Sequence, residues 1–301
     1  MKASTRATLM ALTGYSIWGF SFLFSKLAMG SASPLVMLAV RFAVSFLTLN
    51  LLALSGKVNF HLRGKPLGPL LLLGFVQPVL YFICETYGIA LTSSSFAGVM
   101  IGLVPVVGLV FGRLFLKESC TLRQVICAVA SIAGVMMTTV GGLGNISLPG
   151  TLILMGAVLC AALFNTISRS ISQQFSAFER TYVMFALGSV VYVIIAVAEN
   201  RRDLSVFAAA LSSPGFLIAV FYLSVLSSVV GFLLINSAVS ELSVGKICIF
   251  NNFVTVISVL AGIFIMKDSF TALQLLGIVI IILSVVGVSY QKSMPAPAEK
   301  E

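Results

Sequence analysis

Charged side chains are scarce in this sequence, and acidic ones are the scarcest. Only 9% of the 301 residues are Asp, Glu, Lys or Arg, whereas soluble domains carry about 25%. A folded soluble protein needs more charge than this to cover its surface, so the composition excludes a soluble domain. The 18 basic residues outnumber the 9 acidic ones. In so apolar a chain, this excess of basic residues is typical of the cytoplasmic loops of a membrane protein. We therefore predict no nucleic-acid partner.

The residues that most enzymes need are also nearly missing. The chain has one histidine, His61, and two aspartates, Asp203 and Asp268, none of them inside a predicted span. Intramembrane hydrolysis needs a metal site, an aspartate pair or a Ser–His arrangement. The five cysteines form no C-x-x-C pair and are interpreted as small packing residues. We therefore predict no enzyme activity, no cofactor and no metal site.

Long apolar runs make up most of the chain. Hydrophobic residues form 59% of it, and a transmembrane helix needs about 20 mostly apolar residues. The remaining residues suffice only for short loops and tails, so we predict an all-α polytopic membrane protein. Its ten predicted transmembrane helices cover residues 8–29, 34–55, 67–91, 95–116, 122–141, 150–172, 180–198, 214–238, 245–266 and 271–290.

The basic residues favour one of the two sides that successive spans create. If the N-terminus is cytoplasmic, the inside segments hold 13 of the 18 Lys and Arg residues, including Arg169, Arg180 and those of the 57–65 loop. Cytoplasmic loops carry an excess of Lys and Arg. Both termini are therefore predicted to be cytoplasmic, and these basic residues are interpreted as determinants of topology.

The two halves of the chain share a polar turn. Residues 117–124 (KESCTLRQ) match residues 267–274 (KDSFTALQ) at an offset of 150, with four of eight positions identical. Five spans separate the copies, and successive spans alternate in direction, so the copies are predicted to lie upside down relative to each other. Two inverted five-helix repeats follow, residues 1–146 and 147–290, with a disordered cytoplasmic tail at 291–301. Such repeats serve alternating access around a site near the bilayer midplane.

An ordered set of short motifs resembles the EamA-type ten-helix members of the drug/metabolite transporter superfamily. The motifs are residues 17–22 (IWGFSF), Ser33-Pro34, Arg41-Phe42, residues 87–93 (YGIALTS), Leu103-Val104-Pro105, Leu116-Lys117-Glu118 and Met266-Lys267-Asp268. The second half departs from the family pattern at Thr255, where a proline is expected, and at Asp268, where a glutamate is expected. The resemblance implies a multi-pass secondary transporter in a bacterial plasma membrane, often an exporter of amino acids or other small metabolites.

Glu85 is the most informative single residue, because it lies inside the third predicted span. An intramembrane carboxylate is costly and is a functional candidate by default. Gln77, Tyr81 and Glu85 recur at helical spacing, so they are predicted to share a polar face that lines a cavity. Glu85 either couples transport to protons or binds a substrate ammonium group, or it forms a permanent ion pair with Arg41 or Lys26.

Amides inside the spans are the next candidates. Asn251 and Asn252 lie in the ninth span, with weaker candidates Asn165 in the sixth and Asn236 in the eighth. An amide in lipid is costly, so each is expected to face protein or a cavity. They bind substrate or join neighbouring helices, and both readings stay open. Trp18 lies in the middle of the first span, where it stacks on a substrate or packs between helices.

The leading function is therefore a secondary transporter of a small amphiphilic or zwitterionic solute, most simply an exporter. A channel or a non-transporting membrane partner is the alternative, although the rings of charge or filter loop typical of channels are not visible. An intramembrane enzyme is the least favoured reading. The expected partners are a small-molecule substrate and the lipid bilayer. Protons are a candidate coupling ion, and a monomer and a homodimer are both open.

Overall fold

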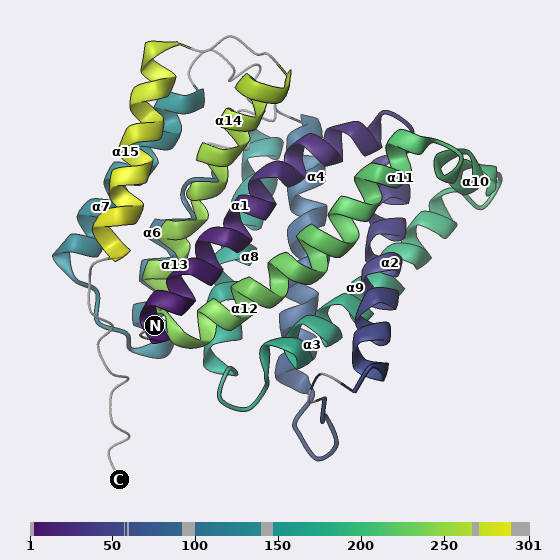
Figure 1. The fold of residues 1–301 in the computed structure, drawn as a ribbon, viewed down its shortest axis with the longest axis horizontal. Coiled ribbons are helices and arrows are strands. Elements are labelled where there is room, and N and C mark those ends of the chain that lie inside the picture. The colour runs from purple at the N-terminus through teal and green to yellow at the C-terminus, as the bar shows by residue number, and fades with distance from the viewer. Residues whose placement is uncertain are drawn as a thin grey trace.

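The computed structural model describes residues 3–56, 58, 60–91, 100–139, 147–266 and 271–289, and all regular structure in these ranges is helical (Figure 1). The helices are α1 Ala3–Met29, α2 Pro34–Leu54, α3 Gly68–Gly74, η1 Phe75–Leu80, α4 Tyr81–Leu91, α6 Val104–Leu116, α7 Leu122–Thr139, α8 Leu148–Ser170, α9 Ala177–Glu199, α10 Ser205–Leu211, α11 Pro214–Phe221, η2 Tyr222–Gly231, α12 Phe232–Glu241, α13 Val244–Asn251, α14 Phe253–Met266 and α15 Ala272–Ser289.

These helices correspond to the ten predicted spans. Among the described residues, six helical segments are long and apolar enough to cross a membrane, and four shorter apolar helices accompany them. The third span consists of α3, η1 and α4, the eighth of α11, η2 and α12, and the ninth of α13 and α14. The predicted all-α class is confirmed. The short helix α10 between the seventh and eighth spans was not predicted, and the tail 291–301 lies outside the described residues.

Contacts between the two halves come in equivalent pairs. Where a span of the first half packs on a span of the second, the two corresponding spans with their halves swapped also pack on each other. The third span packs on the sixth through α4 and α8, and the eighth packs on the first through α12 and α1. In the same way, α6 contacts α8 and α14 contacts α1, while α2 contacts η2 and η1 contacts α9. The pairs α2–α9, α6–α13 and α7–α15 each join equivalent spans. Contacts made by spans of the first half therefore recur at the equivalent spans of the second half.

Local structure repeats as well. The third and eighth spans each contain a π-helix, η1 and η2. The backbone N–H of Thr121 donates to Gln124 Oε1 at 2.9 Å, and that of Gln124 donates to Thr121 Oγ1 at 3.3 Å. The equivalent bonds between Thr271 and Gln274 have the same two lengths. The polar turn found in the sequence thus starts α7 and α15 with the same capping box, although residues 267–270 lie outside the described part.

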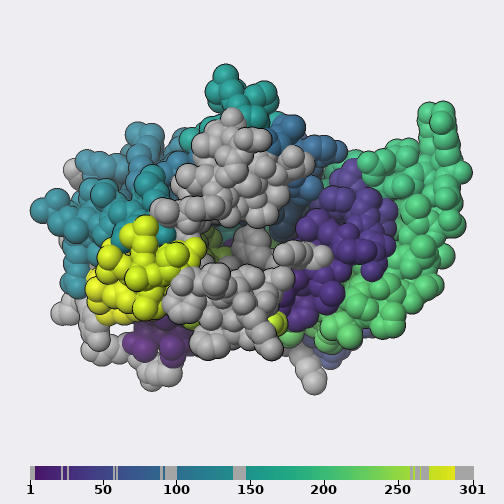
Figure 2. All heavy atoms as spheres, turned by 90° about the horizontal axis from the view of Figure 1, so that it is seen from above, coloured from purple at the N-terminus to yellow at the C-terminus, as the bar shows by residue number. Residues whose placement is uncertain are grey.

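Close helix contacts follow the same exchange. A Cβ on Gly14 of α1 would come within 2.8 Å of the Ile235 side chain in α12, and one on Gly156 of α8 would come within 3.2 Å of Cys84 Sγ in α4. Seen from above the view of Figure 1, α7 and α15 form one edge of the molecule and α10 and α11 the other (Figure 2). Outward faces carry exposed apolar side chains suited to lipid, including Leu47, Leu51, Ile126, Val129, Ile194 and Leu283.

We call the end of the bundle at which α1 begins and α2 ends the basic end. The N-terminus and the last described helix, α15, both reach it (Figure 1). The ends of α6, α8 and α12 and the beginnings of α7, α9 and α13 lie there too, because successive spans alternate in direction. The other end is called the opposite end.

Candidate functional site

Tyr81 and Glu85 meet on α4. The Tyr81 hydroxyl donates to Glu85 Oε1 at 2.9 Å, one helical turn along the same face. Gln77 does not continue this face, which corrects the prediction from helical spacing. Its backbone is extended, with φ −145° and ψ 121°, directly before Pro78, because a residue that precedes proline is forced out of the helical region. The Gln77 side chain is buried, and its Oε1 has no hydrogen-bond partner among the described residues.

Arg41 lies beside this pair, but it does not form an ion pair with Glu85, which was one of the two alternatives for this carboxylate. The ion pairs among the described residues join Lys65 to Glu179 and Arg169 to Glu118. Arg41 takes part in no ion pair among the described residues, and the Lys26 side chain lies outside the described part. The permanent-pair reading of Glu85 with Arg41 is therefore not what the structure shows.

Neutral groups hold the Arg41 guanidinium instead. Its Nε donates to Ser228 Oγ at 2.9 Å and its Nη2 to Ser227 Oγ at 3.2 Å. The guanidinium carbon lies 5.0 Å from the centroid of the Phe82 ring, a cation–π distance. Arg41 is 4% exposed. A buried cation is thus solvated by serine hydroxyls of η2 and by an aromatic face, and none of the described carboxylates lies within ion-pair distance of it.

Trp18 is tied to the same π-helix. Its indole N–H donates to the backbone oxygen of Ser227 at 3.1 Å, while Ser21 Oγ donates to Ser227 Oγ at 2.7 Å. The Trp18 ring contacts Tyr15 and Phe232, with centroid separations of 5.5 and 4.7 Å. π-helical segments often occur at functional sites. Here η2 supplies acceptors to the first and second spans, and Trp18 packs between helices.

Asn252 joins the two halves at matching helix breaks. The fourth span turns at Gly102 before α6 begins, and the ninth turns at Asn252 between α13 and α14, 150 residues later. Asn252 Nδ2 donates to the Gly102 backbone oxygen at 3.3 Å and to Ser131 Oγ at 2.9 Å. Asn252 is 1% exposed, whereas Asn251 beside it is half-buried. Interrupted helices at corresponding positions of two repeats are the best structural indicator of a transport site.

Asn165 and Asn236 have different surroundings. Asn165 Nδ2 donates to the Ala161 oxygen at 3.1 Å and contacts Cys248 Sγ at 3.5 Å, but its buried Oδ1 has no partner among the described residues. Asn236 is fully engaged: Ser168 Oγ donates to its Oδ1 at 2.7 Å, and its Nδ2 donates to Thr181 at 2.9 Å. Asn236 therefore joins helices, while Asn165 keeps a buried acceptor without a partner among the described residues.

Arg180 was interpreted from the sequence as a loop charge that sets topology, and the structure places it differently. It is completely buried, and Nη1 donates to the Ser168 oxygen at 2.7 Å. Nη2 donates to the Asn236 oxygen at 2.8 Å and to Ser240 Oγ at 2.5 Å. Arg180 thus binds the C-terminal turns of α8 and α12, where a cation complements the helix dipole. No pattern in the sequence pointed to this network, because its partners Ser168, Asn236 and Ser240 come from two helices far apart in the chain.

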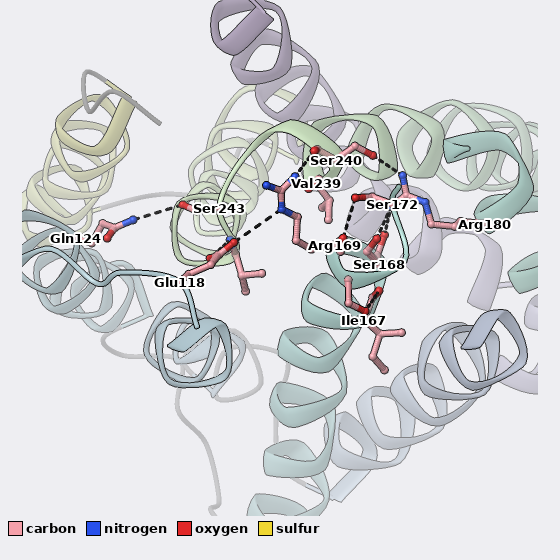
Figure 3. Close-up of polar contacts among 12 residues, drawn as sticks. Glu118, Gln124, Ile167, Ser168, Arg169, Ser172, Arg180, Val239, Ser240 and Ser243 are labelled. Carbon is pink, nitrogen blue, oxygen red and sulfur yellow. Dashed lines mark hydrogen bonds and ion pairs between the residues drawn. The ribbon is translucent and has the colours of Figure 1, made fainter. Parts of the chain in front are cut away.

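In the sequence Glu118 stood out only as part of the repeated turn and of the Leu116-Lys117-Glu118 motif, yet it contacts the other half (Figure 3). Its Oε2 accepts the backbone N–H of Val244 at 2.9 Å, and its Oε1 lies 3.8 Å from Arg169 Nε. Gln124 Nε2 donates to Ser243 Oγ at 3.4 Å. Burial raises the pKa of Glu118 above its ordinary value, although the Val244 N–H and Arg169 act in the opposite direction.

Comparison with known proteins agrees with this architecture. The model of the EamA-like transporter family matches residues 5–140 and 148–290. The uncharacterized transporter YcxC of Bacillus subtilis is 34% identical over 288 residues, which cover 94% of this chain and 92% of that protein. An uncharacterized transporter of Archaeoglobus fulgidus is 24% identical over 281 residues, which cover 91% and 97%.

A solved crystal structure shows the same fold. It aligns with 95% of this chain and 95% of its own chain at a TM-score of 0.78, with 17% sequence identity. At this identity the likeness concerns the fold alone.

Proposed function

Because the chain belongs to the EamA-like transporter family, we propose that this transporter exports a small amphiphilic or zwitterionic metabolite as a secondary transporter working by alternating access. Family and relatives indicate a membrane-embedded transporter of a small molecule and not an enzyme. We further propose that the two halves, residues 1–146 and 147–290, are inverted repeats that rock against each other. A channel or a non-transporting partner does not account for two exchangeable halves as simply.

The observation that carries the proposal is the hydrogen bond from Asn252 to Gly102. It joins the breaks of two equivalent helices, one from each half, at positions 150 residues apart. In transporters built from inverted repeats, the cargo site lies where such interrupted helices meet. Asn252, Asn251 and the acceptor of Asn165 then belong to a central site near the bilayer midplane.

The charges around Phe82 support a zwitterionic cargo. Arg41 lies on the Phe82 ring, Tyr81 contacts that ring with a centroid separation of 5.2 Å, and Tyr81 holds Glu85. One cation and one carboxylate thus flank the same aromatic group without an ion pair between them. A cargo carboxylate on Arg41 and a cargo ammonium on Glu85 would satisfy both charges. Glu85 also becomes free to carry a proton when cargo leaves.

Orientation follows from the basic residues. We propose that the basic end faces the cytoplasm of a bacterial plasma membrane, with both termini inside, because Lys and Arg gather in cytoplasmic loops. The opposite end then opens to the outside.

The test is exchange of a metabolite library across vesicles reconstituted with the full chain. We expect transport of a zwitterion by the wild-type protein and its loss in Glu85→Gln and in Arg41→Gln. Glu199→Gln and Arg201→Gln, both exposed at the opposite end, are the matched controls and retain transport. Wild-type flux in Glu85→Gln would remove Glu85 from the mechanism.

Proton coupling has a separate test. If Glu85 carries protons, wild-type export against a cargo gradient stops when the pH gradient is dissipated, while cargo exchange at equal pH continues. Export that ignores the pH gradient contradicts proton coupling and leaves the cargo site untouched.

A further inference from the structure

The beginning of α13 is capped in an unusual way. Four other serines that precede helices, Ser33, Ser147, Ser176 and Ser213, accept the backbone N–H three residues on with their own hydroxyl. Ser243 has the same extended backbone, with φ −63° and ψ 151°, but its side chain makes no cap bond. The carboxylate of Glu118, which follows α6 in the first half, instead accepts the backbone N–H of Val244, the first residue of α13.

We propose that Glu118, Gln124, Arg169, Ser243 and Val244 form a latch that closes the basic end between the two halves and must open before cargo reaches the central site from that end. This inference rests on alternating access as proposed above. A helix N-terminus attracts a carboxylate wherever it comes from. A cap from the same segment would stabilise α13 in every state, whereas a cap from the other half exists only while the halves are close together.

The joint between α12 and α13 is held from two sides. Arg180 donates to the Asn236 oxygen, and Arg169 Nη1 donates to the backbone oxygens of Val239 and Ser240, so two arginines fix the end of α12 (Figure 3). Leu242 follows with an extended backbone, φ −103° and ψ 149°. The end of α12 is therefore anchored within the second half, while the start of α13 depends on Glu118. Leu242 can act as the hinge between them.

The latch lies directly over the central site. Arg169 is one helical turn beyond Asn165 on α8, and Val244 is one turn before Cys248 on α13. Asn165 and Cys248 contact each other at 3.5 Å, and Cys248 is completely buried. Small residues let α6 and α13 meet here, since a Cβ on Gly108 would lie 2.3 Å from Cys248 Sγ. Separation of α13 from α6 would therefore expose Cys248 and Asn165 together.

The hold of Glu118 on Val244 suits a contact that opens. The carboxylate receives one backbone N–H, and the Arg169 Nε is 3.8 Å away, beyond hydrogen-bond distance. Burial raises the pKa of Glu118 despite both neighbours, so its desolvation is incompletely compensated. Arg180, by contrast, makes short hydrogen bonds to acceptors on both α8 and α12, as a permanent connection between helices would.

Native Cys248 reports the latch directly. The full chain is prepared with Cys84, Cys120, Cys127 and Cys160 replaced by serine or alanine, and Cys248 is labelled with a membrane-impermeant maleimide from the basic end and, separately, from the opposite end. We expect Glu118→Ala to raise the labelling rate from the basic end about fivefold, the factor that corresponds to the loss of one helix cap. Glu241→Gln, an exposed carboxylate at the same end, leaves the rate unchanged.

A second variant separates a latch from a local cap. Ser243→Asp supplies α13 with its own cap, so in the Glu118→Ala background it restores the helix start without restoring the tie between halves. We expect labelling from the basic end to stay raised in this double variant. A return to the wild-type rate means that Glu118 only stabilises α13, and equal labelling from both ends means general loosening; either result overturns the latch.

The labelling needs no cargo, so it is independent of the transport assay. Raised labelling in a protein that transports nothing in the library supports the latch and counts against the proposed cargo class. If transport depends on Glu85 but Glu118→Ala does not change the labelling, the result supports the proposed cargo class and refutes the latch.

Discussion

Replacement of Arg180 by lysine separates the two roles that this residue could have. Lysine keeps the positive charge, so a residue that only set topology would tolerate the change. In the structure, however, the guanidinium of this fully buried residue donates to the backbone oxygens of Ser168 and Asn236 at 2.7 and 2.8 Å, and to the hydroxyls of Ser168 and Ser240 at 2.5 Å each. A lysine ammonium has three donors at one point and cannot reproduce this planar fork.

The loss can be worked out from these contacts. Nε of Arg180 also donates to the Ser176 oxygen at 3.4 Å. That oxygen and the Asn236 oxygen keep a second donor, the Arg180 backbone N–H and Ser240 Oγ. The Ser168 oxygen and the hydroxyls of Ser168 and Ser240 lose the guanidinium, and an ammonium whose donors lie at one point leaves at least one of these three acceptors unpaired. A buried acceptor without a partner costs about 1–3 kcal/mol. For a chain of this size each kcal/mol lowers Tm by about 2–4 °C. We therefore expect Arg180→Lys to melt at least about 2 °C below the wild-type protein.

The assay is thermal melting of the purified chain in one detergent, followed by helix content. Arg202→Lys, at an exposed position of the opposite end, is the control and should melt with the wild-type protein. A tag accessibility assay confirms that both variants keep the wild-type orientation. If Arg180→Lys melts within about 1 °C of wild type, where about 2 °C or more is expected for one unpaired acceptor, the network does not stabilise the fold as argued, and the topological reading stands.

Three further changes test other contacts. Gly108→Ala places a Cβ 2.3 Å from Cys248 Sγ, so it should lower the free energy of unfolding by about 1–3 kcal/mol through overpacking. Adding Cys248→Gly to this variant should restore the melting temperature. Gly68→Ala, with open space around the new Cβ, should leave the melting temperature unchanged. Asn252→Ala leaves the Gly102 oxygen unpaired and should cost about 1–3 kcal/mol, with transport lost at temperatures where the fold persists; full transport would exclude a central role. Because the pKa of Glu118 is raised in the folded state, the folded state holds its proton longer than the unfolded one, so stability should fall as pH rises through the range just above the ordinary glutamate pKa. Glu118→Gln should flatten that part of the pH profile, and an unchanged profile would contradict the assignment.

The spans could be predicted because length and apolarity decide them. A run of about 20 apolar residues has few alternatives to a membrane helix, so all ten predicted spans correspond to helices. The turn at 117–124 likewise revealed the repeat, because its Thr and Gln are needed for a capping box. In the structure, the capping box occurs at Thr121 and again at Thr271.

The site could be predicted only in part. Tyr81 and Glu85 meet as their spacing indicates, but Gln77 leaves the face because the backbone before Pro78 is extended, which helical periodicity does not represent. The partners of Arg41 come from Ser227 and Ser228, almost 190 residues away, in a π-helix that no composition rule marks.

The asparagines show the same limit. Asn236 and Asn252 look alike in an apolar run, yet one joins three helices near the basic end and the other joins the two breaks. Only the three-dimensional neighbours separate such residues.

The hydrogen bond between the two breaks runs in one direction. Asn252 donates and Gly102 accepts, and glycine has no side chain with which to return the bond when the halves exchange roles. Two halves with identical sequences would give inward-facing and outward-facing forms of equal free energy. A one-sided bond removes that degeneracy, so under alternating access this transporter has a preferred resting orientation, and each departure of the empty transporter from that orientation has to overcome the difference.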